Sequence, residues 1–127
     1  MNNPSFKLND NNSIPDHRIW CVSNSKRWST YAAVLKALEI ATDHIDTAVA
    51  YFNETEVGKA IQDSGISRDD IWITSKMWLQ DYAYEDAKKA IDLSLKKLQT
   101  GYIDLYLIHQ PYGKVDEAGK QWKKQNQ

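Results

Sequence analysis

The sequence predicts an α/β fold made of parallel β/α units, preceded by a short β-hairpin. Three short runs rich in β-branched and aromatic residues alternate with longer segments of helical periodicity. The runs span residues 45–48, 71–74 and 103–108. Strands that alternate with helices pair in parallel through right-handed crossovers. With 42% hydrophobic and 26% charged residues, the composition is that of a globular protein.

The first elements are a hairpin and a helix. Residues 6–9 and 13–15 flank a cluster of Asn and Asp, and both residue types favour tight turns. The helix that follows is predicted from Val34, Leu35 and Leu38, which share one apolar face at helical spacing.

The next unit begins with the strand at 45–48. A helix is predicted to start at Asn53, because Glu54 and Glu56 place acidic side chains in its first turn. Gly65 stands where that helix should end.

The last predicted unit contains two strands and one helix. Asp70 leads into the strand at 71–74, and Lys76 stands just past its end. Apolar residues at spacings of three and four then predict a helix over 85–98. His109 follows the strand at 103–108.

Length and composition restrict the classes of function. The 127 residues fit one domain, 1–127, and the net charge of −1 gives no reason to expect nucleic acid or a membrane surface as a partner. Cys21 is the only cysteine, which excludes an internal disulfide, and no apolar run lies near Met1. We therefore expect a cytoplasmic protein. No stretch approaches the roughly 20 apolar residues of a membrane-spanning helix, and we expect no metal site.

Four polar residues are expected to meet at one edge of the sheet. Asp46, Lys76 and His109 lie at or near the C-terminal ends of successive strands, and Tyr51 follows in the loop after Asp46. In α/β folds this edge is where active sites gather. Taken singly, each residue also has an ordinary structural interpretation: a turn cap, a solvated lysine, a hydrogen-bonded loop histidine and a packed tyrosine.

The motifs around these residues point to a known family. They read HIDTAVAYFNE at 44–54, ITSK at 73–76 and YIDLYLIHQP at 102–111. In this order they resemble the aldo-keto reductases, above all the bacterial members similar to 2,5-diketo-gluconate reductase. These oxidoreductases use NADPH to reduce aldehydes and ketones on a TIM (β/α)8 barrel. The resemblance therefore implies NADPH as the cofactor and a small carbonyl compound as the substrate.

The resemblance also implies a catalytic role for each of the four residues. Tyr51 would be the acid that protonates the carbonyl oxygen. Because a tyrosine pKa of about 10 is too high for efficient proton donation at neutral pH, Lys76 and Asp46 would tune it, the ammonium favouring the phenolate. His109 would orient the carbonyl oxygen through a hydrogen bond. Asp46 is also implied as a cofactor-binding residue.

Residues near the four have further implied roles. Trp78 is expected to line the substrate pocket together with His109, and the alternative is that Trp78 packs on Tyr82 or Tyr84. We expect structural roles for Asn53 and Glu54 as caps of the following helix. His44 is expected to pack within its strand, and Cys21 is given no role.

The chain corresponds to part of such a barrel. A complete (β/α)8 barrel takes roughly 250 residues, so residues 5–118 would supply its first half. The family pattern is interrupted at 16–22, where charge replaces a barrel-lining strand, at 41–43, where Ala-Thr-Asp replaces Gly-Tyr-Arg, and at 119–127, where we expect a disordered tail. Each departure can be encoded as an out-of-frame version of the family pattern, so small insertions and deletions in the gene are our hypothesis for all three.

Two other functional hypotheses remain. In the family, loops after the later strands hold much of the NADPH, so this truncated chain could instead be a non-catalytic half-barrel that associates with itself through its open edges. A small flavodoxin-like binding domain is the third hypothesis. The lack of a Gly-rich phosphate loop counts against it.

Overall fold

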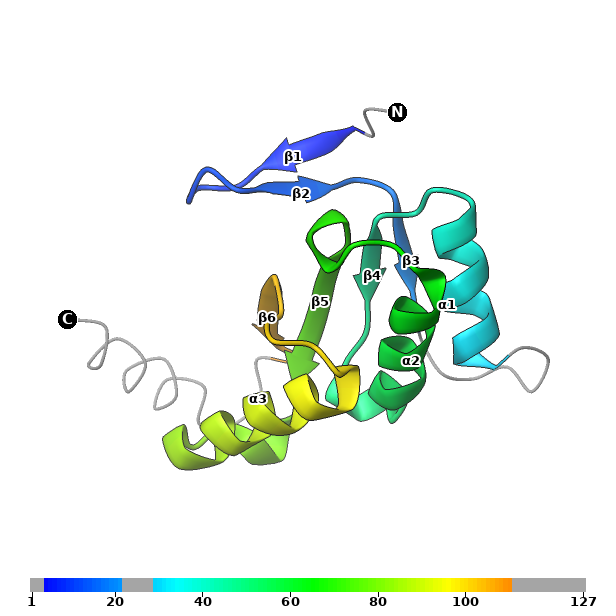
Figure 1. The fold of residues 1–127 in the computed structure, drawn as a ribbon. Coiled ribbons are helices and arrows are strands. Elements are labelled where there is room, and N and C mark those ends of the chain that lie inside the picture. The colour runs from blue at the N-terminus through cyan, green and yellow to red at the C-terminus, as the bar shows by residue number, and fades with distance from the viewer. Residues whose placement is uncertain (1–3, 22–28, 111–127) are drawn as a thin grey trace.

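The computed structural model describes residues 4–21 and 29–110, and a parallel four-stranded sheet lies at its centre, in the order β3-β4-β5-β6. The strands are β3 (Arg18–Trp20), β4 (His44–Asp46), β5 (Trp72–Met77) and β6 (Leu105–Ile108). The helices that pack against it are α1 (Thr30–Glu39), α2 (Glu54–Ser64) and α3 (Tyr84–Leu98). All three lie on one side of the sheet (Figure 1). The predicted α/β fold of parallel β/α units is therefore confirmed.

The N-terminal hairpin is also present. Its strands, β1 (Ser5–Lys7) and β2 (Ser13–Pro15), pair antiparallel. The hairpin lies beside the N-terminal ends of the sheet strands (Figure 1). His44 Nδ1 lies 3.1 Å from the Pro15 carbonyl oxygen. Because a carbonyl can only accept, this nitrogen carries the proton and ties the hairpin to β4.

The apolar core fills the space between the sheet and the helices. Its buried members include Val34 and Leu38 of α1, Val57 and Ile61 of α2, Ile45 and Ile73 of the sheet, and Leu98 at the end of α3. The predicted stripe of α1 is thus correct, with Leu35 partly buried beside it. Alternation along the strands turns Ile45 and Ile73 toward the helices, so Asp46 and Thr74 face the opposite side.

Helix α2 has the predicted ends. Its first turn carries Glu54 and Glu56, and it stops at Gly65, whose φ of 70° is the left-handed conformation that glycine adopts without strain. Gly58 serves a different purpose. A Cβ there would collide with the backbone of Leu98, so glycine permits the close approach of α2 to the end of α3.

Two of the divergent segments have regular structure in their described residues, 16–21 and 41–43. Charge at 16–22 does not prevent a strand, because only Ile19 of β3 turns toward the core, while Arg18 and Trp20 are exposed and the guanidinium lies 5.5 Å from the Trp20 ring. At 41–43, Ala41 has a φ of 71° and closes α1.

The end of α1 is a Schellman motif. The Ala41 N–H donates to the Leu38 carbonyl at 3.2 Å, and the Thr42 N–H donates to the Ala37 carbonyl at 3.0 Å. Ala41 therefore occupies the left-handed position for which glycine is the usual residue, and glycine is also the residue that the sequence resemblance led us to expect here.

Several predicted bounds shift slightly. Strand β5 extends to Met77, so Lys76 lies inside the strand rather than past it. Three short 3-10 helices complete the described chain: η1 (Val49–Tyr51), η2 (Arg68–Asp70) and η3 (Leu79–Asp81). The predicted tail at 119–127 lies outside the described residues.

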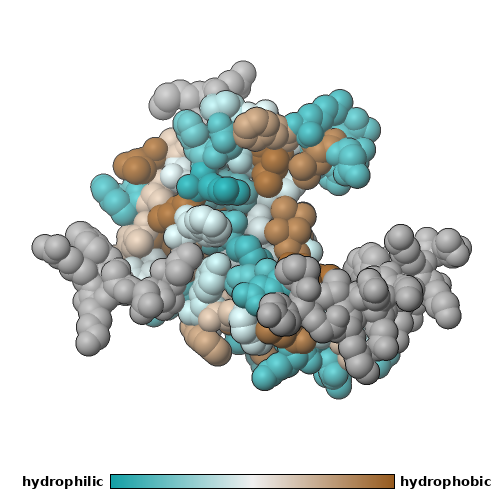
Figure 2. Space-filling model, turned by 180° about the vertical axis from the view of Figure 1, so that it is seen from behind, coloured by the Kyte–Doolittle hydropathy of each residue, from teal (hydrophilic) through white to brown (hydrophobic). Residues whose placement is uncertain are grey.

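Large apolar side chains are exposed at several positions among the described residues. The most exposed large ones include Phe52 (91%), Ile40 (68%) and Trp20 (61%). The face seen in Figure 2 shows separate hydrophobic groups with polar side chains between them. Among the described residues, none of the helices has the length and apolarity needed to cross a membrane.

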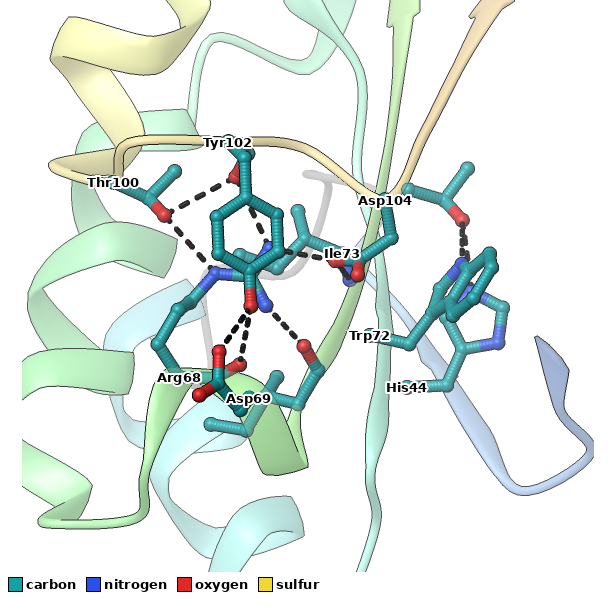
Figure 3. A network of polar contacts seen from close by, with 10 residues as sticks. His44, Arg68, Asp69, Trp72, Ile73, Thr100, Tyr102 and Asp104 are labelled. Carbon is teal, nitrogen blue, oxygen red and sulfur yellow. Dashed lines mark hydrogen bonds and ion pairs between the residues drawn. The ribbon is translucent and has the colours of Figure 1, made fainter. Parts of the chain in front are cut away.

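A polar network centred on Arg68 joins the loops at the N-terminal ends of β5 and β6 (Figure 3). The guanidinium donates to the Asp104 carboxylate at 2.6 Å, to Thr100 Oγ1 at 3.0 Å, and to the carbonyls of Ile71 and Tyr102. It also lies 4.0 Å from the Tyr102 ring centroid. Asp104 in turn accepts the backbone N–H of Ile73 at 2.8 Å. The hydrogen bonds of Arg68 thus connect the start of β5 to the turn before β6.

Candidate active site

The opposite, C-terminal edge of the sheet collects the four predicted site residues. Asp46 is the last residue of β4, Lys76 is the last but one of β5, and His109 follows β6. Tyr51 ends the short helix η1, in the connection from β4 to α2. Because the strands are parallel, all four side chains reach the same rim.

A buried ion pair forms the base of this site. The Lys76 ammonium donates to Asp46 Oδ1, and both side chains are largely buried. The same ammonium donates to the backbone carbonyl of Thr47 at 2.9 Å. Charged groups this far from water are tolerated only when paired and hydrogen-bonded, so the lysine is fixed in place rather than solvated.

Aromatic rings surround the ion pair. The Lys76 ammonium lies 5.4 Å from the centroid of the Tyr51 ring. The His109 ring stands edge-on to Tyr51, with centroids 5.5 Å apart, and edge-on to Trp78 at 5.4 Å. Trp78 thus contacts the site, while Tyr82 packs with Met77 and hydrogen-bonds to Gln110. The structure brings Trp78 and all four predicted residues together.

The electrostatics of Tyr51 differ from the prediction. Its pKa is raised from the usual 10.0, chiefly because burial disfavours the phenolate and secondly because the Asp46 carboxylate is close. The expected lowering by Lys76 was therefore wrong for this chain, since the ammonium is engaged by Asp46 and the Thr47 carbonyl. Tyr51 consequently keeps its proton throughout the neutral range.

His109 is neutral at pH 7. Its pKa is lowered from 6.5, first by burial and then by the positive charge of Lys76, against a smaller opposite effect of Asp46. Within the described residues, its Nδ1 is buried and has no hydrogen-bond partner. Buried polar atoms rarely go unpaired, so this nitrogen is a candidate for a partner outside the described residues.

These findings agree with the similarity to known proteins. A family model described as "Aldo/keto reductase family" matches residues 20–124. The chain belongs to the aldo-keto reductase family. Methylglyoxal reductase DkgA of Escherichia coli is 41% identical over 126 residues, which cover 97% of this chain and 44% of that enzyme.

Solved structures of aldo-keto reductases give the same picture. An aldo/keto reductase from Brucella melitensis, 45% identical, superposes with a TM-score of 0.82 over 99% of this chain and 50% of its own. A Bombyx mori aldo-keto reductase in complex with NADP is 28% identical and superposes with a TM-score of 0.86 over 99% of this chain and 48% of its own. This chain thus spans about half the length of these family members, and its sheet corresponds to half of their barrel.

Other residues of the aldo-keto reductase motif have structural contacts. His44 packs in β4 as predicted, with Nε2 2.9 Å from Thr74 Oγ1. Glu54 is buried and accepts a hydrogen bond from Ser75 at 2.7 Å. Asn53 is structural, but the predicted capping bond is wrong: it stands at the N-cap position without a side-chain cap.

The bonds that Asn53 makes were missed by sequence reasoning. Its side chain is buried and bonds to Thr47, six residues away, and to Cys21 and Thr30, which are 32 and 23 residues away. Of these contacts, sequence reasoning could have suggested only the one between Thr47 and Asn53, which lie on either side of Tyr51 in the sequence. Cys21 itself is buried, which raises the pKa of its thiol to about 12, so it is not a nucleophile at neutral pH.

Proposed function

We propose that the protein is an NADPH-dependent reductase that converts small aldehydes or ketones to alcohols. The observation that carries this proposal is the meeting of Tyr51 and His109 over the buried Asp46–Lys76 pair. The Escherichia coli relative is named a methylglyoxal reductase, and the Bombyx mori relative binds NADP. Since the chain spans half of these proteins, their activity and cofactor enter here as part of the proposal.

The residues of this chain would act on the carbonyl oxygen. Bound NADPH supplies the hydride that such a reduction requires. Tyr51, which is protonated at neutral pH, donates its phenolic proton as negative charge develops on the oxygen. Lys76, held by Asp46, keeps its ammonium beside the Tyr51 ring during this transfer. Neutral His109 donates a hydrogen bond that holds the oxygen in line with Tyr51.

Binding of the substrate and the cofactor would use the same edge. Trp78 contacts His109 and offers an apolar wall for the carbonyl substrate. The buried, unpartnered Nδ1 of His109 suits a polar ligand atom at this point. Asp46 is the described residue that we assign to the cofactor. These residues fit the reacting end of the site, where the carbonyl and the nicotinamide must meet.

A second candidate function is that of a non-catalytic half-barrel that pairs with itself. Among the described strands, β3 and β6 each have a neighbour on one side only. Free strand edges favour association with another chain. For either function we keep the cytoplasm as the predicted location.

The test is the oxidation of NADPH by the purified chain in the presence of a reactive aromatic aldehyde. Tyr51→Phe should lower kcat by about 10²- to 10⁴-fold, the usual contribution of general acid catalysis. Tyr31→Phe is the matched control, because the Tyr31 hydroxyl bonds to Asp63 on α2, outside the four-residue site. Turnover that is equal in both variants would contradict the proposed role of Tyr51. A chain that shows no turnover and sediments as a dimer would favour the second candidate.

A further inference from the structure

The Asn53 side chain makes hydrogen bonds with all of its polar groups. Its Nδ2 donates to the Cys21 carbonyl at 2.6 Å and to Thr30 Oγ1 at 3.4 Å, and its Oδ1 accepts from Thr47 Oγ1 at 2.8 Å. These bonds fix which way the amide points, because turning it over would set two acceptors against each other. Asn53 thus joins the residue after β3 to the residue after β4.

Thr47 is held at three points. Its hydroxyl donates to Asn53, its backbone N–H donates to the Thr74 carbonyl at 2.9 Å, and its own carbonyl accepts from Lys76. Both Asn53 and Thr47 are buried, at 4% and 0% exposure. The direction of the Thr47 carbonyl is therefore determined by bonds on either side of it.

We propose that Asn53 and Thr47 are positioning residues, which aim the Thr47 carbonyl and through it hold the Lys76 ammonium beside Tyr51 and His109. An ammonium on a flexible four-carbon chain can donate to a single carboxylate oxygen from many positions. A second acceptor in a fixed direction restricts it to one. The Asp46 carboxylate attracts the ammonium, and the Thr47 carbonyl fixes the position of the ammonium.

His109 reports the position of this ammonium without any need for turnover. Among the described residues, the charged groups that act on His109 are Lys76, which lowers its pKa, and Asp46, which raises it. If the ammonium moves away, the repulsion weakens and the pKa of His109 rises toward 6.5. The titration of the imidazole protons by NMR measures this directly, and His109→Gln assigns the signal among the three histidines of the chain.

The variants compare loss of the positioning bond with loss of the charge itself. Lys76→Met gives the full shift in the pKa of His109 that removal of the charge causes. Thr47→Val keeps the shape but cannot donate to Asn53, and Thr47→Ser restores the hydroxyl. Ser94→Ala is the matched control, since Ser94 is buried and its hydroxyl lies 3.2 Å from the Tyr106 hydroxyl on the helix side of β6.

We expect Thr47→Val to raise the midpoint of His109 by a substantial part of the Lys76→Met shift. Thr47→Ser and Ser94→Ala should titrate like the unmodified chain. The proposal is overturned if Thr47→Val titrates like the unmodified chain, because Thr47 would then contribute to stability alone. It is also overturned if Ser94→Ala shifts His109 equally, because any buried hydroxyl would then have the same effect.

The catalytic meaning of this inference rests on the proposed reductase function, whereas the titration does not. A chain without reductase activity in which Thr47→Val still shifts His109 would remove the proposed function and leave the positioning role in place. Reductase activity together with an unchanged His109 titration in Thr47→Val would support the proposed function and overturn the positioning role.

Discussion

The two ends of the same strands carry polar networks of different character. At the N-terminal end, Arg68 donates to four partners within the chain, and Asp104 accepts from both Arg68 and Ile73. At the C-terminal end, Tyr51 and His109 meet through ring contacts, and His109 Nδ1 lacks a partner among the described residues. The first network uses its groups to hold the chain together. The second lies at the end of the strands where barrels bind their ligands, which is the division expected of the two faces of a barrel.

The strongest test of this comparison is Arg68→Met. Both side chains of the Arg68–Asp104 pair are about four-fifths buried, and removing one partner of such a pair leaves an uncompensated charge. We expect the free energy of unfolding in urea to fall by about 3 kcal/mol. Tyr51→Phe should leave it nearly unchanged, because Tyr51 is only half-buried. Equal losses for the two variants would mean that the two ends do not differ in this way.

Lys59→Met is the control for charge removal in general. Lys59 pairs with Asp63 on the exposed face of α2, where ion pairs contribute little. Its urea midpoint should match that of the unmodified chain. A large loss there would show that stability responds to net charge rather than to the Arg68 network.

Gly58→Ala sharpens the comparison by disturbing the packing of α2 against the end of α3, next to the N-terminal network. The new methyl group would collide with the backbone of Leu98, just before the turn that carries Thr100 and Asp104. Overpacking of this kind should lower the free energy of unfolding by about 2 kcal/mol, even after alanine's better helix propensity. Gly101→Ala is the matched control because open space surrounds that position. Similar unfolding curves for the two variants would contradict the close packing at Gly58.

Acid should affect the N-terminal end through His44. Burial lowers the pKa of His44 below 6.5, against smaller opposing effects of the Pro15 carbonyl and Asp46. The unfolded chain therefore takes up a proton first. Stability should be complete above about pH 6.5 and decline as pH falls from there through the lowered pKa of the folded state.

His44→Asn should flatten this dependence, measured as the difference between unfolding free energies at neutral pH and pH 5. His17→Asn, at an exposed position after the hairpin, is the control and should keep the full decline. An unchanged decline in His44→Asn would assign the acid sensitivity to other groups, His109 first among them.

Sequence patterns predicted what depends on neighbours along the chain. The helices and strands followed from apolar spacing. The C-terminal ends of the parallel strands then predicted that Asp46, Lys76 and His109 lie together at one edge of the sheet. Properties that depend on three-dimensional surroundings were missed. The raised pKa of Tyr51 comes from burial. The bonds of Asn53 join segments that are up to 32 residues apart. Strand β3 formed despite its charges because alternation turned only Ile19 inward.

The smallest expected effect concerns a departure from the family pattern at the N-terminal end. Ala41 holds the left-handed position of the Schellman motif that ends α1, just before β4. An L-residue with a Cβ is strained there by roughly 1 kcal/mol relative to glycine. Ala41→Gly should therefore raise the urea midpoint by a small but measurable amount, while Ala41→Ser, which keeps a Cβ, should not. A gain would show that the N-terminal end still carries strain that the family's glycine avoids. A loss would mean that the left-handed turn is already stabilised by its hydrogen bonds to Leu38 and Ala37, and that glycine only adds entropy to the unfolded chain.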